Sequence, residues 1–213
     1  MKTVIFDMDG ILIESEHVYT DIENTMLDEL GLDVSDEIKK TFLGAKMDDC
    51  WEMIKDVYDA DFNVADIVKE ERRRYIACLN NGDIQKVDGA HALLTALFKH
   101  GYNLALGTAS KSHEAILIMK QFDYYDFMQT IVTCEDVIAS KPAPDIYLKA
   151  AKDIGTNPHH CVVIEDSKNG IAAAKAANMK CIALKNAYNS DYSKADIVVS
   201  NLNKITINMI ERL

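Results

Sequence analysis

The chain has 213 residues, of which 48% are hydrophobic and 27% are charged, a composition typical of a soluble globular protein with a full core. Its formal net charge of −11 argues against non-specific binding to nucleic acid or to an anionic membrane, because both need basic protein surface. Five scattered cysteines without a Cys-x-x-Cys motif, and the lack of an apolar stretch of about 20 residues, favour a cytoplasmic protein.

The first predicted element is a buried strand over residues 3–6, a short apolar run that turn-forming residues follow. The segment 15–81 then departs from this pattern, because its apolar side chains recur at helical spacing and no convincing strand occurs in it. We therefore predict a small helical domain over residues 15–81, inserted into a core domain that residues 1–14 and 82–213 form together.

The rest of the chain alternates between short apolar runs and helical patterns. Further strands are predicted at residues 103–106, 130–133, 161–164, 181–184 and 196–199. Helices are predicted at residues 90–100, 112–122, 145–154 and 169–177. Such alternation predicts an α/β fold, in which a Rossmann-like parallel sheet carries helices on both faces.

Polar and charged side chains follow four of these strands. Because ligands of open parallel sheets bind beyond the carboxyl ends of the strands, we expect the four groups to meet at one edge. They are Asp7 with Asp9, then Thr108, then Lys141, and finally Glu165 with Asp166. One such occurrence has little weight, because Asp and Gly are common at strand ends, but four together define a candidate site.

The residue types at this edge suit the transfer of a phosphoryl group. Carboxylates are hard oxygen ligands for Mg²⁺, while the ammonium of Lys141 and the hydroxyl of Thr108 can hold phosphate oxygens. A carboxylate and a phosphoryl group are both negatively charged and repel each other. Once a cation and a lysine neutralise this charge, the carboxylate of Asp7 can attack phosphorus. Asp9 is placed to protonate the leaving alcohol and then to activate water.

These motifs together resemble those of the haloacid dehalogenase superfamily, in particular of its members with a helical cap domain inserted after the first motif. The resemblance covers nearly the whole chain. Phe6-Asp7-Met8-Asp9-Gly10 matches the first motif, Thr108 the second, Lys141-Pro142-Ala143-Pro144-Asp145 the third and Glu165-Asp166-Ser167 the fourth. The resemblance implies that the inserted helical domain is a cap.

The resemblance also implies a role for each matched residue. Asp7 would be the nucleophile and Asp9 the acid and base, while Thr108, Ala109 and Lys141 would bind the phosphate group. Mg²⁺ would be held by Asp7, the backbone carbonyl of Asp9 and Asp166, with Glu165 a ligand directly or through water. Gly44 and Lys46 fall in the loop with which family members contact their substrates, although a solvent-exposed lysine explains Lys46 equally well.

We therefore predict a Mg²⁺-dependent phosphatase, a phosphoric monoester hydrolase, that acts as a monomer on a small phosphorylated metabolite such as a sugar or polyol phosphate. A β-phosphoglucomutase-like phosphomutase is the nearest alternative, but the cap histidine and arginine associated with that activity align with Tyr19 and Met47. A non-catalytic binding protein on the same fold is the alternative from another class. Such a protein should have lost at least one of the two aspartates of the first motif, the lysine or the last aspartate, and all are present.

Three other charged groups are better explained without a role in the site. His159-His160 precedes its strand and so belongs to the opposite edge of the sheet. Glu135-Asp136 is expected to face solvent on the loop that leads to Lys141. Arg72-Arg73-Arg74 follows Glu70-Glu71, so ion pairs at helical spacing account for it.

Overall fold

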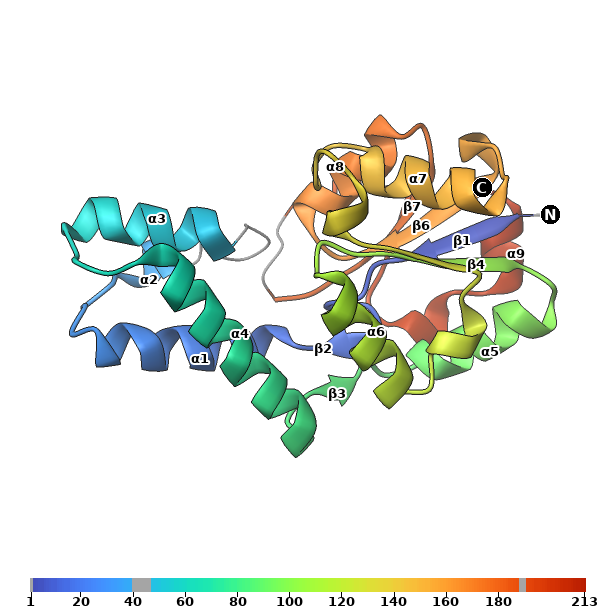
Figure 1. Cartoon of the computed structure of the whole chain (residues 1–213). Coiled ribbons are helices and arrows are strands. Elements are labelled where there is room, and N and C mark those ends of the chain that lie inside the picture. The colour runs from blue at the N-terminus through green and yellow to red at the C-terminus, as the bar shows by residue number, and fades with distance from the viewer. Residues whose placement is uncertain (1, 40–46, 188–190) are drawn as a thin grey trace. The chain divides into compact units, whose positions relative to one another are not determined.

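The computed structural model describes residues 2–39, 47–187 and 191–213 (Figure 1). The chain divides into two compact units, one formed by residues 1–14 and 86–213 and the other by residues 15–85. Among the described residues, no helix is both long enough and apolar enough to cross a membrane.

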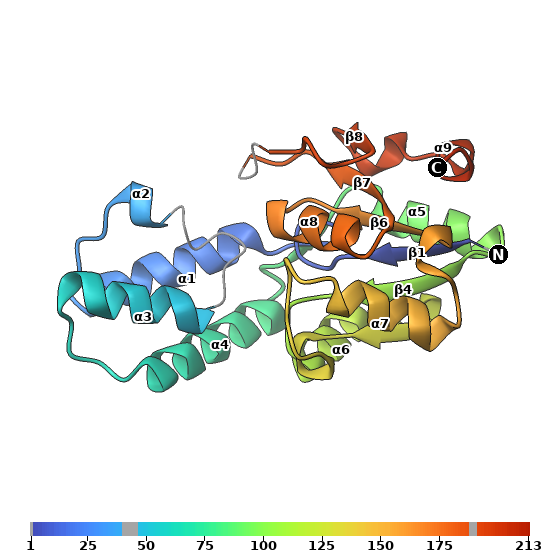
Figure 2. The same cartoon turned by 90° about the horizontal axis from the view of Figure 1, so that it is seen from above.

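The first unit is built on a six-stranded parallel sheet in the order β5-β4-β1-β6-β7-β8 (Figure 2). Its strands are β1 (Thr3–Phe6), β4 (Asn103–Gly107), β5 (Thr130–Val132), β6 (Cys161–Glu165), β7 (Lys180–Leu184) and β8 (Ile197–Val199). Phe6 of β1 is in register with Leu106 on one side and Ile164 on the other. The strand order reverses at β1, so its carboxyl end lies at a topological switch point, where α/β sheets bind ligands.

Helices cover both faces of this sheet, which confirms the predicted fold class (Figure 1). Helices α7 (Asp145–Ile154) and α8 (Lys168–Ala176) lie on one face, and α5 (Ala90–Lys99) lies on the other with the short α9 (Ile207–Glu211). The unit also contains α6 (Ser112–Gln121) and the 3₁₀ helices η1 (Tyr125–Phe127), η2 (Cys134–Asp136), η3 (Pro158–His160) and η4 (Leu202–Lys204).

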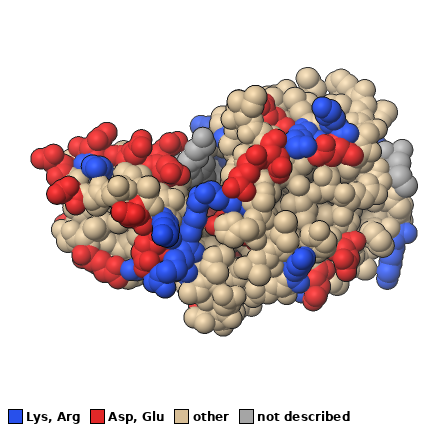
Figure 3. Space-filling model, in the orientation of Figure 1, with Lys and Arg blue, Asp and Glu red and all other residues tan. Residues whose placement is uncertain are grey.

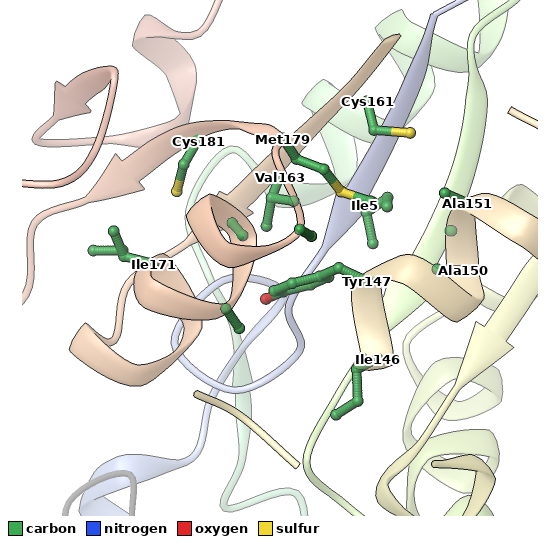
Figure 4. Packing of buried hydrophobic residues seen from close by; sticks show 14 of the residues in the cluster. Ile5, Ile146, Tyr147, Ala150, Ala151, Cys161, Val163, Ile171, Met179 and Cys181 are labelled. Carbon is green, nitrogen blue, oxygen red and sulfur yellow. The ribbon is translucent and has the colours of Figure 1, made fainter. Parts of the chain in front are cut away.

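Small side chains let α7 and α8 approach the sheet closely. Ala150 and Ala151 of α7 pack with Ile5 and Val163 of the sheet in one buried cluster (Figure 4). Tyr147 projects from α7 into the same cluster and is fully buried. Dense packing of this kind holds the strand ends rigidly in place, so the residues that follow the strands are well positioned.

The second unit is helical and is inserted after β2 (Ile13–Glu14), before β3 (Gln85–Lys86). Its helices are α1 (Glu16–Glu29), α2 (Asp36–Lys39), α3 (Met47–Tyr58) and α4 (Val64–Asn81). The expected apolar faces are buried, with Ile22 of α1, Trp51 and Ile54 of α3 and Tyr75 of α4 among them. The short elements α2, α9, β2 and β3 have no periodic pattern of their own and were not predicted.

Acidic side chains gather over the helical unit on the face shown in Figure 3. Helix α3 exposes Asp48, Asp49, Glu52 and Asp56, while Trp51 on its other side is buried. This division makes α3 amphipathic and explains why it packs by one face only.

Two carboxyl groups of the helical unit, one buried and one partly buried, have raised pKa values. Glu71 of α4 is 1% exposed, and its Oε2 accepts a hydrogen bond from Trp51 Nε1 at 2.7 Å. Burial raises the pKa of Glu71, and burial together with the charges of Glu71 and Glu16 raises the pKa of Glu23 to about 8. Both groups therefore bind protons more tightly in the folded state than in the unfolded chain.

From this linkage, we expect the helical unit to lose stability as the pH rises from 4.5, the ordinary pKa of glutamate, toward 8. The variant Glu71→Gln keeps an acceptor for Trp51 but cannot ionise, so the pH dependence of its unfolding midpoint should be shallower than that of the wild type. Urea unfolding followed by the fluorescence of Trp51, the single tryptophan, measures this difference. Parallel pH profiles for the two proteins would contradict it, and the exposed Glu52→Gln serves as the control.

Candidate active site

The carboxyl ends of neighbouring strands bring the predicted site residues to one edge of the sheet. Asp7 follows β1, and its backbone N–H still donates to Ile164 O of β6 at 3.0 Å. Thr108 follows β4 and donates in the same way to Val132 O of β5 at 3.0 Å. The parallel register therefore places the residues after β1, β4 and β6 side by side.

Lys141 is the link between two of these strand ends. Its Nζ lies 2.7 Å from Asp7 Oδ1 and 2.9 Å from Glu165 Oε1, and its side chain is only 6% exposed. Burial by itself would lower the pKa of Lys141, but the charges of Asp7 and Glu165 outweigh it and raise that pKa. The lysine is therefore a permanent buried cation at this edge of the sheet.

Tyr147 contacts both Lys141 and Glu165. Its ring centroid lies 5.0 Å from Lys141 Nζ, and its hydroxyl donates to Glu165 Oε1 at 3.0 Å. Gly107 makes room for the ring, because a Cβ atom at that position would lie 3.1 Å from two ring carbons of Tyr147. A cation over an aromatic face is stabilised by the ring quadrupole, so the tyrosine holds both the lysine and its carboxylate partner.

Five donors converge on the carboxylate of Glu165. Oε1 accepts from Lys141 and Tyr147, while Oε2 accepts from the backbone N–H groups of Asp166 and Ser167 and from the Ser167 hydroxyl. Burial opposes ionisation, yet the Lys141 charge and these hydrogen bonds lower the pKa of Glu165. The Glu165 carboxyl group is therefore ionised. Because a carboxylate has about four acceptor positions, the five donors fill its hydrogen-bonding capacity.

Asp7, Glu165 and Asp166 form a cluster that could hold a metal ion. One carboxylate oxygen from each lies within 4.8 Å of the others, and all three residues are buried. Gly10, at φ +75°, passes so close to Asp166 that a Cβ atom there would overlap the carboxylate. Hard oxygen donors without a soft ligand are the set that Mg²⁺ prefers, so the donor chemistry fits this metal.

The charges at the edge also favour a bound cation. Burial, helped by the charges of Glu165 and Asp9 and opposed by Lys141, raises the pKa of Asp7 to about 7. One lysine therefore does not offset both the burial of Asp7 and the excess of negative charge beside it. A divalent cation would balance the excess and keep Asp7 ionised at neutral pH.

Ser110 connects two of the predicted residues. Its hydroxyl donates to Asp9 Oδ2 at 3.1 Å, and its backbone N–H donates to Thr108 Oγ1 at 3.0 Å. Thr108 is 1% exposed, whereas Ala109 is exposed at the start of the loop that leads to α6. The sequence offered one signal for Ser110, its place two residues after Thr108, and none for the contact with Asp9.

Other predicted residues lie away from this cluster or outside the described residues. Gly44 and Lys46 belong to the segment 40–46, which is outside the described residues. His159 and His160 are exposed in η3, which precedes β6 and so stands at the opposite edge. The remaining charged groups make local contacts. Glu135 accepts from the Ser112 N–H, and Asp136 accepts from the N–H and the hydroxyl of Thr133, the N-cap residue of η2. Arg73 and Arg74 pair with Glu70.

Comparison with known proteins places this site in a family. The family model of haloacid dehalogenase-like hydrolases matches residues 4–184. Hexitol phosphatase B of Escherichia coli K12 is 31% identical over 95% of this chain and 93% of its own length. Protein CbbY of Rhodobacter capsulatus is 30% identical over 100% of this chain and 99% of its own length.

A solved structure agrees in fold. The crystal structure of CbbY from Rhodobacter sphaeroides in complex with phosphate superposes with a TM-score of 0.88, at 24% identity, and covers 99% of each chain. The match of the family model runs from β1 to the end of β7 and so includes every strand end that contributes to the site. The chain therefore belongs to the haloacid dehalogenase-like hydrolase family, as a hydrolase of the phosphatase type.

Proposed function

We propose that this protein is a Mg²⁺-dependent phosphatase that hydrolyses a small phosphorylated metabolite through a covalent aspartyl-phosphate on Asp7. One observation carries the proposal: Lys141 Nζ lies 2.7 Å from Asp7 Oδ1, within the cluster that Asp7 forms with Glu165 and Asp166. A carboxylate that is held beside a permanent cation and a metal site can approach an anionic phosphoryl group. The relatives support a sugar or polyol phosphate, since one of them is a hexitol phosphatase.

The positions of the side chains support a chemical role for each aspartate. Asp7 attacks phosphorus, so that a bond from its carboxylate oxygen to phosphorus forms while the bond to the leaving alkoxide breaks. Asp9 donates a proton to that alkoxide, and the alcohol leaves. Asp9 then accepts a proton from a water molecule that attacks the aspartyl-phosphate, which releases inorganic phosphate and restores Asp7.

The phosphate group needs donors as well as a nucleophile. Lys141 and Thr108, with the backbone around Ala109, would hold its oxygens. Asp7, the backbone carbonyl of Asp9 and Asp166 would hold Mg²⁺, which supplies charge neutralisation for the transferred phosphoryl group. Because five donors already occupy its oxygens, Glu165 would chiefly orient Lys141.

The helical unit would act as the cap that selects the substrate, and Gly44 and Lys46 would contact that substrate. A phosphomutase would need a cap histidine and a cap arginine, which align with Tyr19 and Met47. Tyr19 stacks on Tyr75, with ring centroids 4.3 Å apart. These two positions favour transfer of the phosphoryl group to water over its return to a sugar.

The test is to follow phosphate release from a panel of sugar and polyol phosphates, with Mg²⁺ and with excess chelator. We expect stoichiometric release that chelator abolishes and added Mg²⁺ restores, because the site has more carboxylates than one lysine neutralises. Full activity in chelator would contradict the metal-assisted mechanism. β-Glucose 1-phosphate with a trace of the 1,6-bisphosphate completes the panel: rapid isomerisation with little free phosphate would establish the phosphomutase instead.

A further inference from the structure

Asn186 contacts one of the carboxylates of the metal cluster. It lies just beyond the carboxyl end of β7, which pairs with β6 so that Glu165 is in register with Ala183. Its Nδ2 donates to Asp166 Oδ2 at 2.7 Å. Strand β7 thus delivers a neutral donor to the same sheet edge as the acidic residues.

The orientation of the Asn186 amide follows from its neighbours. An ionised carboxylate can only accept, so the NH₂ group must be the part that faces Asp166. On the backbone side, the Asn186 N–H donates to the Tyr192 hydroxyl at 2.8 Å. The Tyr192 ring is partly buried against the hydrophobic cluster of the sheet, so Asn186 is tied to a rigid part of the fold.

We propose that Asn186 is a positioning residue that fixes the Asp166 carboxylate for metal binding. This inference rests on the proposed function, in which Asp166 is a metal ligand. The amide holds one carboxylate oxygen, and the close approach of Gly10 confines the same group from another direction. Rotation about the Cβ–Cγ bond is thereby restricted, so less conformational freedom is lost when a metal binds.

Asn186 has an uncharged side chain, which suits a residue beside a metal ligand. A lysine or arginine in this place would also donate to Asp166, but its positive charge would compete with the bound cation. An amide orients the carboxylate and leaves its charge for the metal. Donors in the outer shell of metal sites act in this way, and their loss typically weakens metal binding about 10–100-fold.

The decisive measurement is the dissociation constant of Mg²⁺, determined by calorimetric titration of the whole protein. In Asn186→Ala, we expect this constant to rise about 10–100-fold, while kcat at saturating Mg²⁺ and KM for the phosphorylated substrate stay close to the wild-type values. Asn186→Leu, which fills the space but cannot donate, should behave in the same way. Tyr192→Phe keeps the ring in the cluster and loses only the hydroxyl, so its effect should be smaller in the same direction.

The control is Asn203→Ala. The Asn203 amide also donates to an aspartate, Asp88 Oδ2 at 2.8 Å, but on an exposed part of the same unit, and Mg²⁺ affinity should not change there. Folded Asn186→Ala and Asn186→Leu proteins with the wild-type dissociation constant would overturn this inference alone. A wild-type protein that is fully active in excess chelator would overturn the proposed function, and this inference with it.

Discussion

Replacing Asp7 with asparagine is expected to lower kcat on the order of 10⁴-fold or more, because an amide cannot form the acyl phosphate. The fold should survive the change, since the two side chains have nearly the same shape. Asp7 is buried and its pKa is raised to about 7, so ionisation of this group costs the wild type stability at pH 8. The neutral asparagine variant should therefore be at least as stable as the wild type at that pH. Phosphate release in a single turnover, with thermal unfolding of the same sample, measures both effects.

The matching control for Asp7→Asn is Asp153→Asn. Asp153 lies on the outer side of α7, where its carboxylate pairs with Lys149 at 2.9 Å, and we expect unchanged turnover from that variant. A second measurement locates the phosphoryl group directly: brief incubation of the wild-type enzyme with labelled substrate should give a hydroxylamine-sensitive acyl phosphate on Asp7. Label on Thr108, Ser110 or a histidine would contradict the assignment of the nucleophile.

Replacing Lys141 with methionine is expected to remove nearly all activity and to destabilise the protein as well. Methionine fills the space of the lysine stem but leaves Asp7 and Glu165 without their shared cation. Breaking a buried ion pair on one side typically costs about 3–5 kcal/mol. Turnover should fall by about 10²–10³-fold, the usual cost of removing one charge-stabilising group from an active site.

The pH dependence of Lys141→Met distinguishes this explanation from simple misfolding. Without the ammonium, the pKa values of Asp7 and Glu165 should rise, so that the folded state binds more protons than the unfolded chain. The variant should therefore lose stability relative to the wild type as the pH rises from 5 toward 8. Urea unfolding at several pH values tests this, and an equal loss at every pH would contradict it. The control Lys149→Met, which removes a surface ion pair with Asp153, should cost less than about 1 kcal/mol.

The framework of the sheet could be predicted from short stretches of sequence. The buried strands β1, β4 and β6 are apolar runs that turn residues follow. In the helices between them, apolar side chains recur at helical spacing. Because parallel strands present their carboxyl ends at one edge, the approach of Asp7, Lys141, Glu165 and Asp166 to one another could also be expected before any coordinates. Local pattern and a general rule of topology were sufficient for that step.

The contacts that tune the site could not be predicted in this way. Ser110 with Asp9, Tyr147 with Glu165 and Asn186 with Asp166 each join residues from different elements, separated by 101, 18 and 20 positions. Tyr147 looks like an ordinary core residue of a helix, and Asn186 like an ordinary turn residue.

The meeting of Asp7, Lys141 and the acidic cluster at one edge could thus be expected from the sequence alone, because residue types and strand-end positions are local properties. Only the tertiary structure decided which donors fill Glu165 and which amide orients Asp166. The physical reason is that hydrogen-bond partners depend on distances between strand ends and on side-chain direction, and these quantities are set by the packing of the whole sheet.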